Sequence, residues 1–322
     1  MSVLVYIDQA KGQAKKAGLE AAYYASKVAE QMGTTATGIF LGEASESDVA
    51  AVGNAGVSKV LHINEAKFNG FDSKAFTKAI AEAADKEGAT VVVLSYNQNG
   101  KLLGSRLSVR MQAGFVPGAN GLPNGDFVVS KAVFSGKAVA NYTFNTDKKI
   151  IGVTPNSVPP QKTDATASVE AFSSSVSDAD FGTKVRSVEV VDGEIPLTEA
   201  DKVVSAGRGL KGPENWGMVE ELAREMGAAT ACSRPVADVG WRPHHEHVGQ
   251  TGVMVRPDLY IAIGISGAIQ HLAGVNQSKV IVVINNDAEA PFFKAADYGI
   301  VGDAFDVVPK FLEAFKKFKA AQ

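Results

Sequence analysis

The sequence contains almost no cysteine, since Cys232 is the only one among 322 residues. A single thiol cannot form a disulfide within the chain, and this scarcity is typical of proteins that fold in a reducing compartment. We therefore expect a cytoplasmic protein, in which Cys232 is buried as a small apolar side chain.

Long apolar runs are also missing. Even the most apolar stretch, residues 257–275, is interrupted by glycines, Gln270 and His271, so it falls short of the ~18 residues of a membrane-spanning helix. The apolar start at residues 3–7 reaches Asp8 with no basic residue before it, which predicts a first strand and not a signal peptide. We expect a protein that is not embedded in a membrane.

Neither sign of charge is in large excess. The 32 basic and 35 acidic side chains leave a formal charge of -3, so no global field attracts nucleic acid or an anionic membrane. Hydrophobic residues make up 45% of the chain, enough for a substantial core, and the length favours two domains.

The first half alternates strand-like and helix-like runs. Leu19, Tyr23, Val28 and Met32 recur at helical spacing between apolar runs. The strands are predicted at 3–7, 35–41, 58–64 and 90–96, with a further helix over 75–86. Apolar strands interleaved with helices predict a parallel sheet covered on both faces, a Rossmann-like α/β domain.

The pattern changes after Gly118. Residues 126–134 and 137–144 flank the Ser135-Gly136 turn and predict an added antiparallel hairpin, with another strand over 148–154. Residues 163–180 show little periodicity, and a strand is predicted over 185–191. We place the domain boundary near 192–199 and predict domains 1–191 and 192–322.

The second half repeats the α/β alternation. It predicts a doubly wound domain with strands in 201–206, 229–234, 257–264, 278–285 and 296–303, and with helices in 214–227, 267–274 and from 304 through Phe315.

Two glycine loops follow strands of this second domain. Gly207–Gly212 matches GxGxxG, which is compatible with pyrophosphate binding and equally with close packing of strand and helix. No acidic residue ends the next strand, where a ribose ligand is expected. The second loop, Gly264–Ala268, ends a buried strand with glycines and a hydroxyl. Two such loops in one domain favour a large dinucleotide over a single phosphate.

Polar and cationic residues lie in other loops of the same domain. Arg208, Lys211, Arg234 and Arg242 are predicted to contribute positive charge. Gln250 and Thr251 offer an amide and a hydroxyl between two glycines, chemistry suited to the polar edge of a ring system.

These motifs together resemble one known family. The segments SAGRGLKGPEN, CSRPVADVGW, VGQTG, PDLYIAIGISGAIQHLAGV, INNDAEAPFF and ADYGIVGDAFDVVP are similar, in this order, to the C-terminal FAD domain of electron transfer flavoprotein alpha subunits. The resemblance covers residues 200–315 and is most specific over 257–274.

The resemblance implies an electron carrier that is not itself an enzyme. It implies FAD held by residues 192–322, a heterodimer with a beta subunit, residues 1–191 as scaffold and interface to that subunit, and AMP in the beta subunit. Electrons would come from acyl-CoA dehydrogenases or related flavin dehydrogenases and pass singly to a membrane quinone oxidoreductase. No nucleic-acid partner is implied.

The resemblance also implies site residues. Arg208, Ser233, Ser266, Gly267, Ala268 and Asn285 would contact the phosphates, the ribityl chain or the AMP half of FAD, and Asp303 with Ala304 would lie near the adenosine. Arg234 would lie against the isoalloxazine ring, Gln250 and Thr251 near its N5 and C4 oxygen edge, and His271 near its C2 oxygen, favouring negative charge there. Val248, Gly249, Ile269 and Gln270 complete the cofactor-binding set.

Three other interpretations stay open at this level. An NAD-dependent dehydrogenase could use the Gly207–Gly212 loop, with His271 or a residue of 244–247 as proton donor. A nucleotide-binding structural or signalling subunit could use the first domain, although Asp8 to Gly12 contains a single glycine. The His244-His245-Glu246-His247 run could bind zinc, but we interpret it as an exposed polar loop and expect no metal. His62 is predicted to be structural.

Overall fold

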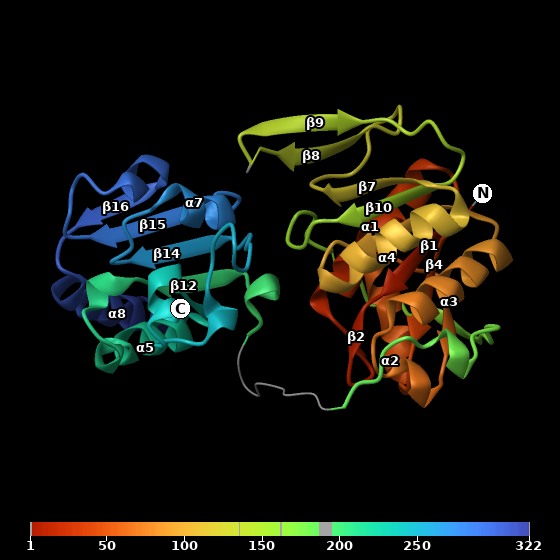
Figure 1. Ribbon diagram of the computed structural model, residues 1–322, viewed down its shortest axis with the longest axis horizontal. Coiled ribbons are helices and arrows are strands. Elements are labelled where there is room, and N and C mark those ends of the chain that lie inside the picture. The colour runs from red at the N-terminus through yellow and green to blue at the C-terminus, as the bar shows by residue number, and fades with distance from the viewer. Residues whose placement is uncertain (1, 135, 162, 187–194, 322) are drawn as a thin grey trace. The chain divides into compact units, whose positions relative to one another are not determined.

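The chain divides into two compact units. The computed structural model describes residues 2–134, 136–161, 163–186 and 195–321, and it separates unit 1, Met1–Val190, from unit 2, Val191–Gln322 (Figure 1). The domain boundary predicted between residues 191 and 192 lies outside the described residues, and so does most of the strand predicted over 185–191.

Unit 1 contains a seven-stranded sheet whose neighbouring strands are all parallel. In spatial order its strands are β11 (Ser168–Ala171), β5 (Lys59–Ile63), β4 (Ala36–Leu41), β1 (Ser2–Ile7), β6 (Ala89–Ser95), β10 (Lys149–Val153) and β7 (Gly114–Ala119). The helices are α1 (Lys16–Gln31), α2 (Glu46–Ala50), α3 (Ser73–Lys86) and α4 (Gln98–Met111).

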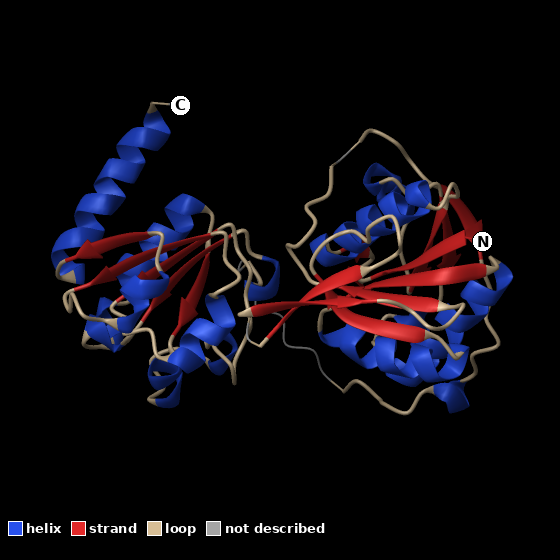
Figure 2. Cartoon of the chain, turned by 90° about the horizontal axis from the view of Figure 1, so that it is seen from above, coloured by secondary structure: helices blue, strands red, loops and turns tan. Residues whose placement is uncertain are grey.

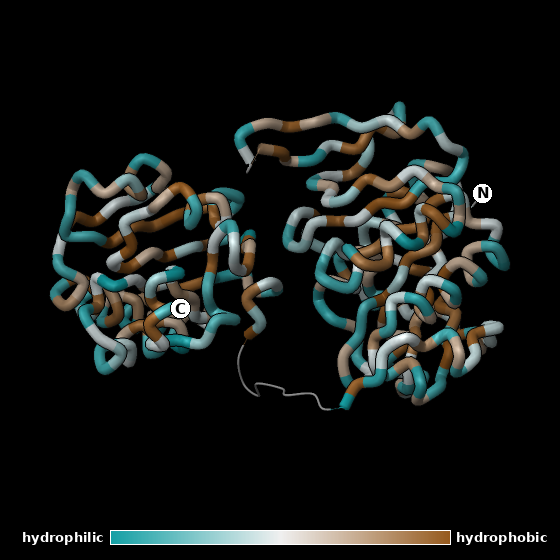
Figure 3. The backbone as a smooth tube through the Cα atoms, in the orientation of Figure 1, coloured by the Kyte–Doolittle hydropathy of each residue, from teal (hydrophilic) through white to brown (hydrophobic). Residues whose placement is uncertain are grey.

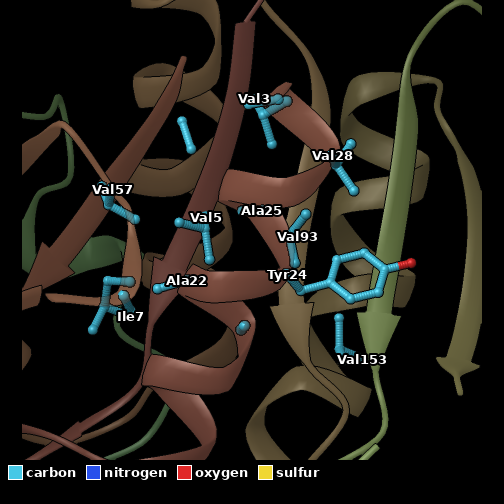
Figure 4. Close-up of a cluster of buried hydrophobic side chains, with 14 of the residues drawn as sticks. Val3, Val5, Ile7, Ala22, Tyr24, Ala25, Val28, Val57, Val93 and Val153 are labelled. Atoms are coloured by element: carbon cyan, nitrogen blue, oxygen red, sulfur yellow. The ribbon is translucent and has the colours of Figure 1, made fainter. Parts of the chain in front are cut away.

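Both faces of this sheet are covered. Val3 and Val5 of β1 pack with Tyr24 and Val28 of α1 on one face (Figure 4), whereas Leu4 packs on the opposite face with residues of α3 and α4. Period-two alternation of buried side chains therefore places apolar residues on both sides of β1. The parallel, doubly covered α/β fold predicted for the first half is confirmed.

Two antiparallel hairpins complete unit 1. The predicted hairpin is present as β8 (Val129–Val133) and β9 (Ala138–Tyr142), and a second, very short one joins β2 (Gln9–Ala10) to β3 (Gln13–Ala14). Residues 163–180, whose sequence shows little periodicity, contain β11, which pairs with β5. β11 is a partly exposed edge strand, so it has no alternation for the sequence to show.

His62, predicted to be structural, is buried in β5. Its Nε2 atom lies 2.9 Å from the Gly42 carbonyl oxygen, and its ring meets Phe40 edge to face.

Unit 2 is a doubly wound α/β unit, as predicted. Its five parallel strands are, in spatial order, β13 (Ala229–Cys232), β12 (Lys202–Ala206), β14 (Leu259–Ile263), β15 (Val280–Asn285) and β16 (Tyr298–Val301). Its helices are α5 (Gly217–Met226), α6 (Arg234–Asp238), α7 (Ile269–Val275) and α8 (Ala304–Ala320), and Figure 2 shows helices on both faces of the strands. The last helix runs five residues past the predicted end at Phe315.

Each face of the unit 2 sheet carries its own apolar cluster. Val204 and Ile261 pack with residues of α5 and α8, whereas Tyr260 and Val283 pack with Phe292. The middle strands accordingly form a hydrophobic band in the backbone trace (Figure 3). β12 and β14 are neighbours in the sheet. The chain leaves β12 for β13 on one side, and it leaves β14 for β15 on the other side. The carboxyl ends of β12 and β14 therefore form a topological switch point.

No helix in the described part of the chain is long and apolar enough to cross a membrane.

Candidate functional site

The carboxyl ends of all five strands of unit 2 lead into the predicted binding loops. β12 continues into Gly207, β13 into Ser233 and β14 into Gly264, while β15 ends at Asn285 and β16 is followed by Asp303 after one residue. Parallel strands end at the same edge of a sheet, so residues that are far apart in sequence gather there (Figure 1).

The glycines of the first two loops allow close packing of backbone on backbone. The Gly207 N-H donates to the Ile263 carbonyl at 2.9 Å, and the Gly209 N-H donates to the Gly264 carbonyl at 3.1 Å. A Cβ atom on Gly207 would lie 2.4 Å from the Gly264 oxygen. Gly264 also has a left-handed φ of +59°. Packing at the switch point therefore requires these glycines.

The Gly207–Gly212 segment does not run directly into a helix. Lys211 has a left-handed φ of +66°, Pro213 opens a short 3-10 turn, and α5 begins only at Gly217. The next strand, β13, ends at Cys232 and is followed by Ser233 and Arg234, so no acidic ribose ligand stands there. Both observations argue against the NAD-dependent dehydrogenase.

A cavity of about 510 Å³ opens at this edge of the sheet. It is lined by these predicted residues: Arg208, Ser233, Arg234, Val248, Gly249, Gln250, Thr251, Ser266, Ala268, Gln270, His271 and Asn285. The structure thus brings together residues from four separate loops, the start of α7 and the end of β15.

The loop that carries Gln250 and Thr251 is held tightly against α7. The Gln250 N-H donates to the Gln270 carbonyl at 2.7 Å, and a Cβ atom on Gly274 would lie 2.6 Å from the Gly249 nitrogen. The side chains of Gln250 and Thr251 are exposed at the cavity, whereas Val248 is fully buried behind them. The backbone of this loop is therefore fixed while two polar side chains stay available.

His271 forms a buried wall of the cavity as a neutral imidazole. Burial lowers its pKa to about 4, the charge of His247 acts in the same direction, and the Val248 backbone opposes them. Its Nε2 atom lies 2.9 Å from the Tyr260 hydroxyl, and its ring meets Phe292 edge to face. At neutral pH this side chain supplies no full positive charge.

Two of the four predicted loop cations reach the cavity. Arg208 and Arg234 line it, and the Arg234 side chain is 61% exposed with one loose partner, Asp238 at 3.3 Å. Burial lowers the pKa of His247, and the positive charge of Arg234 lowers it further, which places that charge beside the site.

The other two loop cations, Lys211 and Arg242, do not line the cavity. Lys211 lies 3.7 Å from Asp303 and over the Phe305 ring. Arg242 forms a two-point ion pair with Glu246 and a third contact with Glu220.

Four predicted residues do not line the cavity. Gly267 packs on Phe292, where a Cβ atom would lie 2.5 Å from the Phe292 Cβ. Ile269 is 63% exposed, and Ala304 is buried at the start of α8. Asp303 caps that helix by accepting the Phe305 N-H at 2.9 Å. These residues shape or flank the loops around the cavity.

Five lining residues were not predicted: Pro235, His247, Gly264, Ile265 and Asp287. All five adjoin or lie within two residues of a predicted residue, so proximity along the chain was the available signal. Gly264 was recognised as part of a glycine loop but not as a lining residue.

The exposed polar loop predicted for His244–His247 is half wrong. His244 and His245 are exposed, but Glu246 and His247 are buried. Glu246 forms an ion pair with Arg242 in the interior, and His247 pairs through its backbone with Cys232. Among the described residues, no three His, Cys, Asp or Glu side chains are arranged to hold a metal ion. Cys232 is fully buried, as predicted.

The fold and the cavity define a nucleotide-type cofactor-binding unit, in which a parallel sheet presents its loops and two arginines at a switch point. Family comparison agrees. Residues 196–276 match the electron transfer flavoprotein FAD-binding domain, and residues 3–179 match the electron transfer flavoprotein domain.

Curated relatives extend this match to almost the whole chain. The electron transfer flavoprotein subunit alpha of Bacillus subtilis is 38% identical over 285 residues, 87% of each chain. That of Thermoanaerobacterium thermosaccharolyticum is 33% identical over 98% of each chain. That of Paracoccus denitrificans is 57% identical over 123 residues, covering 38% of this chain and 40% of that relative.

The chain belongs to the electron transfer flavoprotein alpha subunit family. It is an electron carrier with FAD as its cofactor, and as an alpha subunit it has a beta-subunit partner. The residues present fit FAD: cationic, hydroxyl and amide side chains suit phosphates and a polyol, and the buried wall of Val248, Ile265 and His271 suits a ring system.

Proposed function

We propose that this protein, paired with a beta subunit, accepts electrons from acyl-CoA dehydrogenases and related flavin dehydrogenases and passes them one at a time to a membrane quinone oxidoreductase. It would turn over no substrate of its own. The observation that supports this role best is the cavity at the carboxyl edge of unit 2, where the FAD-binding residues implied by the family resemblance meet.

The isoalloxazine ring would lie in the part of the cavity bounded by α6, the 248–251 loop and α7. Arg234 would lie against the ring, and Gln250 with Thr251 would face its N5 and C4 oxygen edge. His271 would form the neutral wall beside the C2 oxygen. The exposure of the Arg234, Gln250 and Thr251 side chains, and their place at one cavity, support this assignment.

The phosphates, ribityl chain and AMP half would use the remaining loops. Arg208 offers a guanidinium, and Ser233, Ser266 and Asn285 offer polar side chains at the same edge. Asn285 is already oriented, because its Nδ2 donates to the Ile265 carbonyl at 3.0 Å. Asp303 with Ala304 would lie near the adenosine, and Gly267 would act through its backbone.

FAD, when bound, supplies reversible uptake and release of electrons. The protein contributes electrostatics and exclusion of water. A positive charge at Arg234 favours added negative charge on a neighbouring ring, and the fully buried Val248 keeps one wall dry.

Unit 1 would serve as scaffold and as the interface to the beta subunit, in which AMP is expected. The hairpin of β8 and β9 supports an interface role, since Phe134 is 84% exposed and Val139 is 69% exposed. The cytoplasmic location expected from the cysteine content stays a prediction.

The test is an anaerobic reductive titration of the chain purified with its beta subunit. We expect one FAD per heterodimer, reduction by an acyl-CoA with its dehydrogenase, and reoxidation by a quinone oxidoreductase. NADH alone should leave the flavin oxidised. A colourless protein that binds NAD instead would refute the proposal.

A further inference from the structure

His247 is a buried histidine in the wall of the cavity, and no sequence motif predicted it there. It lines the cavity and is 7% exposed. Its backbone pairs with Cys232 of β13, and its carbonyl oxygen accepts the Val253 N-H at 2.8 Å. The main chain alone therefore anchors this residue, and the imidazole is not needed for that purpose.

The imidazole of His247 packs against the 248–253 loop, which presents Gln250 and Thr251. A Cβ atom on Gly252 would lie 2.8 Å from Nδ1 and 2.9 Å from Cγ of the ring, so this glycine covers the Nδ1 edge. A Cβ atom on Gly249 would lie 3.5 Å from Nε2, which is an ordinary contact distance. Nε2, at the far end of the ring, is accordingly the less crowded nitrogen.

The side chain of His247 has no hydrogen-bond partner among the described residues. Buried polar atoms normally have a partner, and a buried atom left without one destabilises the folded state. The missing partner of His247 must therefore come from outside the described chain, and the cavity that the residue lines is the place from which it can reach the ring.

The charges around His247 keep its ring neutral. Burial lowers its pKa, Arg234 and His244 lower it further, and Asp238 opposes them. His271, on the neighbouring α7, is neutral as well. At neutral pH the imidazole of His247 therefore has one donor nitrogen and one acceptor nitrogen.

The cavity next to His247 is the part that we assign to the isoalloxazine ring. Arg234 and the loop with Gln250 and Thr251 border it, and FAD is the cofactor of the family. The edge of an oxidised isoalloxazine has carbonyl oxygens and ring nitrogens that accept hydrogen bonds, whereas only its N3 donates. A neighbouring side chain with a free N-H therefore suits this edge.

We propose that His247 is a further flavin-contacting residue, whose Nε2-H donates a hydrogen bond to an acceptor atom of the isoalloxazine ring. This contact rests on the proposed placement of the ring. An N-H dipole at that position stabilises the negative charge that reduction adds to the flavin. It does so without a second full positive charge beside Arg234.

The experiment compares His247→Leu with His247→Gln in the intact heterodimer. Leucine has no donor, whereas the glutamine amide can still donate. His247→Leu should bind FAD about tenfold more weakly, because a buried flavin acceptor loses its donor, and the reduction potential of bound FAD should fall. His247→Gln should retain most of the affinity and of the potential. The control is His244→Leu, which removes an exposed imidazole outside the cavity and should change neither quantity.

Nitrogen-15 chemical shifts of His247 in the native heterodimer give a second readout, because they report which ring nitrogen carries the hydrogen. With FAD bound, we expect the hydrogen on Nε2, exchanging with water more slowly than in the FAD-free heterodimer. This spectrum decides the question if neither variant folds.

Three results would overturn the inference. The first is a hydrogen on Nδ1 of His247 when FAD is bound. The second is a His247→Leu protein with native affinity and native potential. The third is an equal loss of affinity in the leucine and glutamine variants with an unchanged potential, because that result indicates packing against Gly252 and no contact with the flavin.

Failure of the proposed function has a different signature. If an acyl-CoA and its dehydrogenase do not reduce the bound FAD, the proposed electron route is refuted. The measurements on His247 require only bound FAD and a chemical reductant, so the contact between His247 and the flavin would stand.

Discussion

Gly209 and Gly264 lie backbone against backbone at the switch point of unit 2. A Cβ atom on Gly209 would lie 2.6 Å from the Gly264 Cα, and one on Gly264 would lie 2.8 Å from the Gly209 Cα. Real side chains do not tolerate such contacts, so the two loops that lead into the cavity depend on glycine at both positions.

Gly264→Ala should destabilise unit 2 by at least about 2 kcal/mol, because the new methyl group both strains a left-handed residue and collides with Gly209. Gly227→Ala is the matched control: it has nearly the same φ, +60° against +59°, but no atom lies within 4 Å of its added Cβ. Urea unfolding followed by tryptophan fluorescence measures both, since Trp216 and Trp241 lie in unit 2. Equal losses would show that φ alone matters.

Arg234→Ala should make bound FAD harder to reduce. The guanidinium is largely exposed, so its effect is screened, and we expect a fall in potential on the order of 40 mV for one electron, equal to about 1 kcal/mol. Lys279→Ala removes an exposed cation at the opposite edge of the same sheet and should leave the potential unchanged. Equal reduction potentials in the Arg234→Ala and native proteins would show that Arg234 does not lie against the isoalloxazine ring.

Stability of unit 2 should fall in mild acid because of His271. Burial lowers its folded-state pKa to about 4, against about 6.5 in the unfolded chain, so the unfolded state binds more protons between these values. The contribution of neutral His271 to the free energy of unfolding should therefore be fully present above pH 6.5, and the free energy of unfolding should decrease by about 3 kcal/mol as the pH falls to 4.

Urea unfolding at a series of pH values tests this. His271→Gln should flatten the slope, and His244→Gln, which removes an exposed imidazole, should keep it. His247 has a pKa that is also lowered, so a smaller slope remains in the His271→Gln protein.

The ion pair of Arg242 and Glu246 stabilises the approach to the 248–253 loop. The Glu246 side chain is 3% exposed, so Arg242→Met would leave a buried carboxylate without its partner and cost about 3 kcal/mol. Arg242→Met with Glu246→Leu should recover most of the loss. The exposed pair of Lys316 and Glu221 is a control, and Lys316→Met should change stability little. No recovery in the double variant would contradict this account.

The elements that sequence predicted well are those buried on both faces. β14 and β15 appear as continuous apolar runs bounded by glycine or polar residues, and this pattern needs no knowledge of neighbours. The site residues of unit 2 were predicted through family motifs, and the parallel sheet explains why they meet.

The failures share a different cause. β11 is specified by pairing with β5, more than 100 residues earlier in the chain, and its own side chains are half exposed. Glu246 is buried against Arg242, which is itself held by the distant Glu220, and His247 pairs through its backbone with Cys232, fifteen residues earlier in the chain. Local periodicity cannot report contacts of this kind.

The chain's only cysteine offers a practical advantage. Cys232 has no exposed surface, and burial raises the pKa of its thiol to about 12. Thiol reagents should therefore not react with Cys232 in the folded protein. A cysteine introduced at Lys279, an exposed residue that directly precedes β15 at the edge opposite the cavity, would then be the sole reactive thiol. A dye attached there would report movements of unit 2, and the native cysteine would not have to be replaced first.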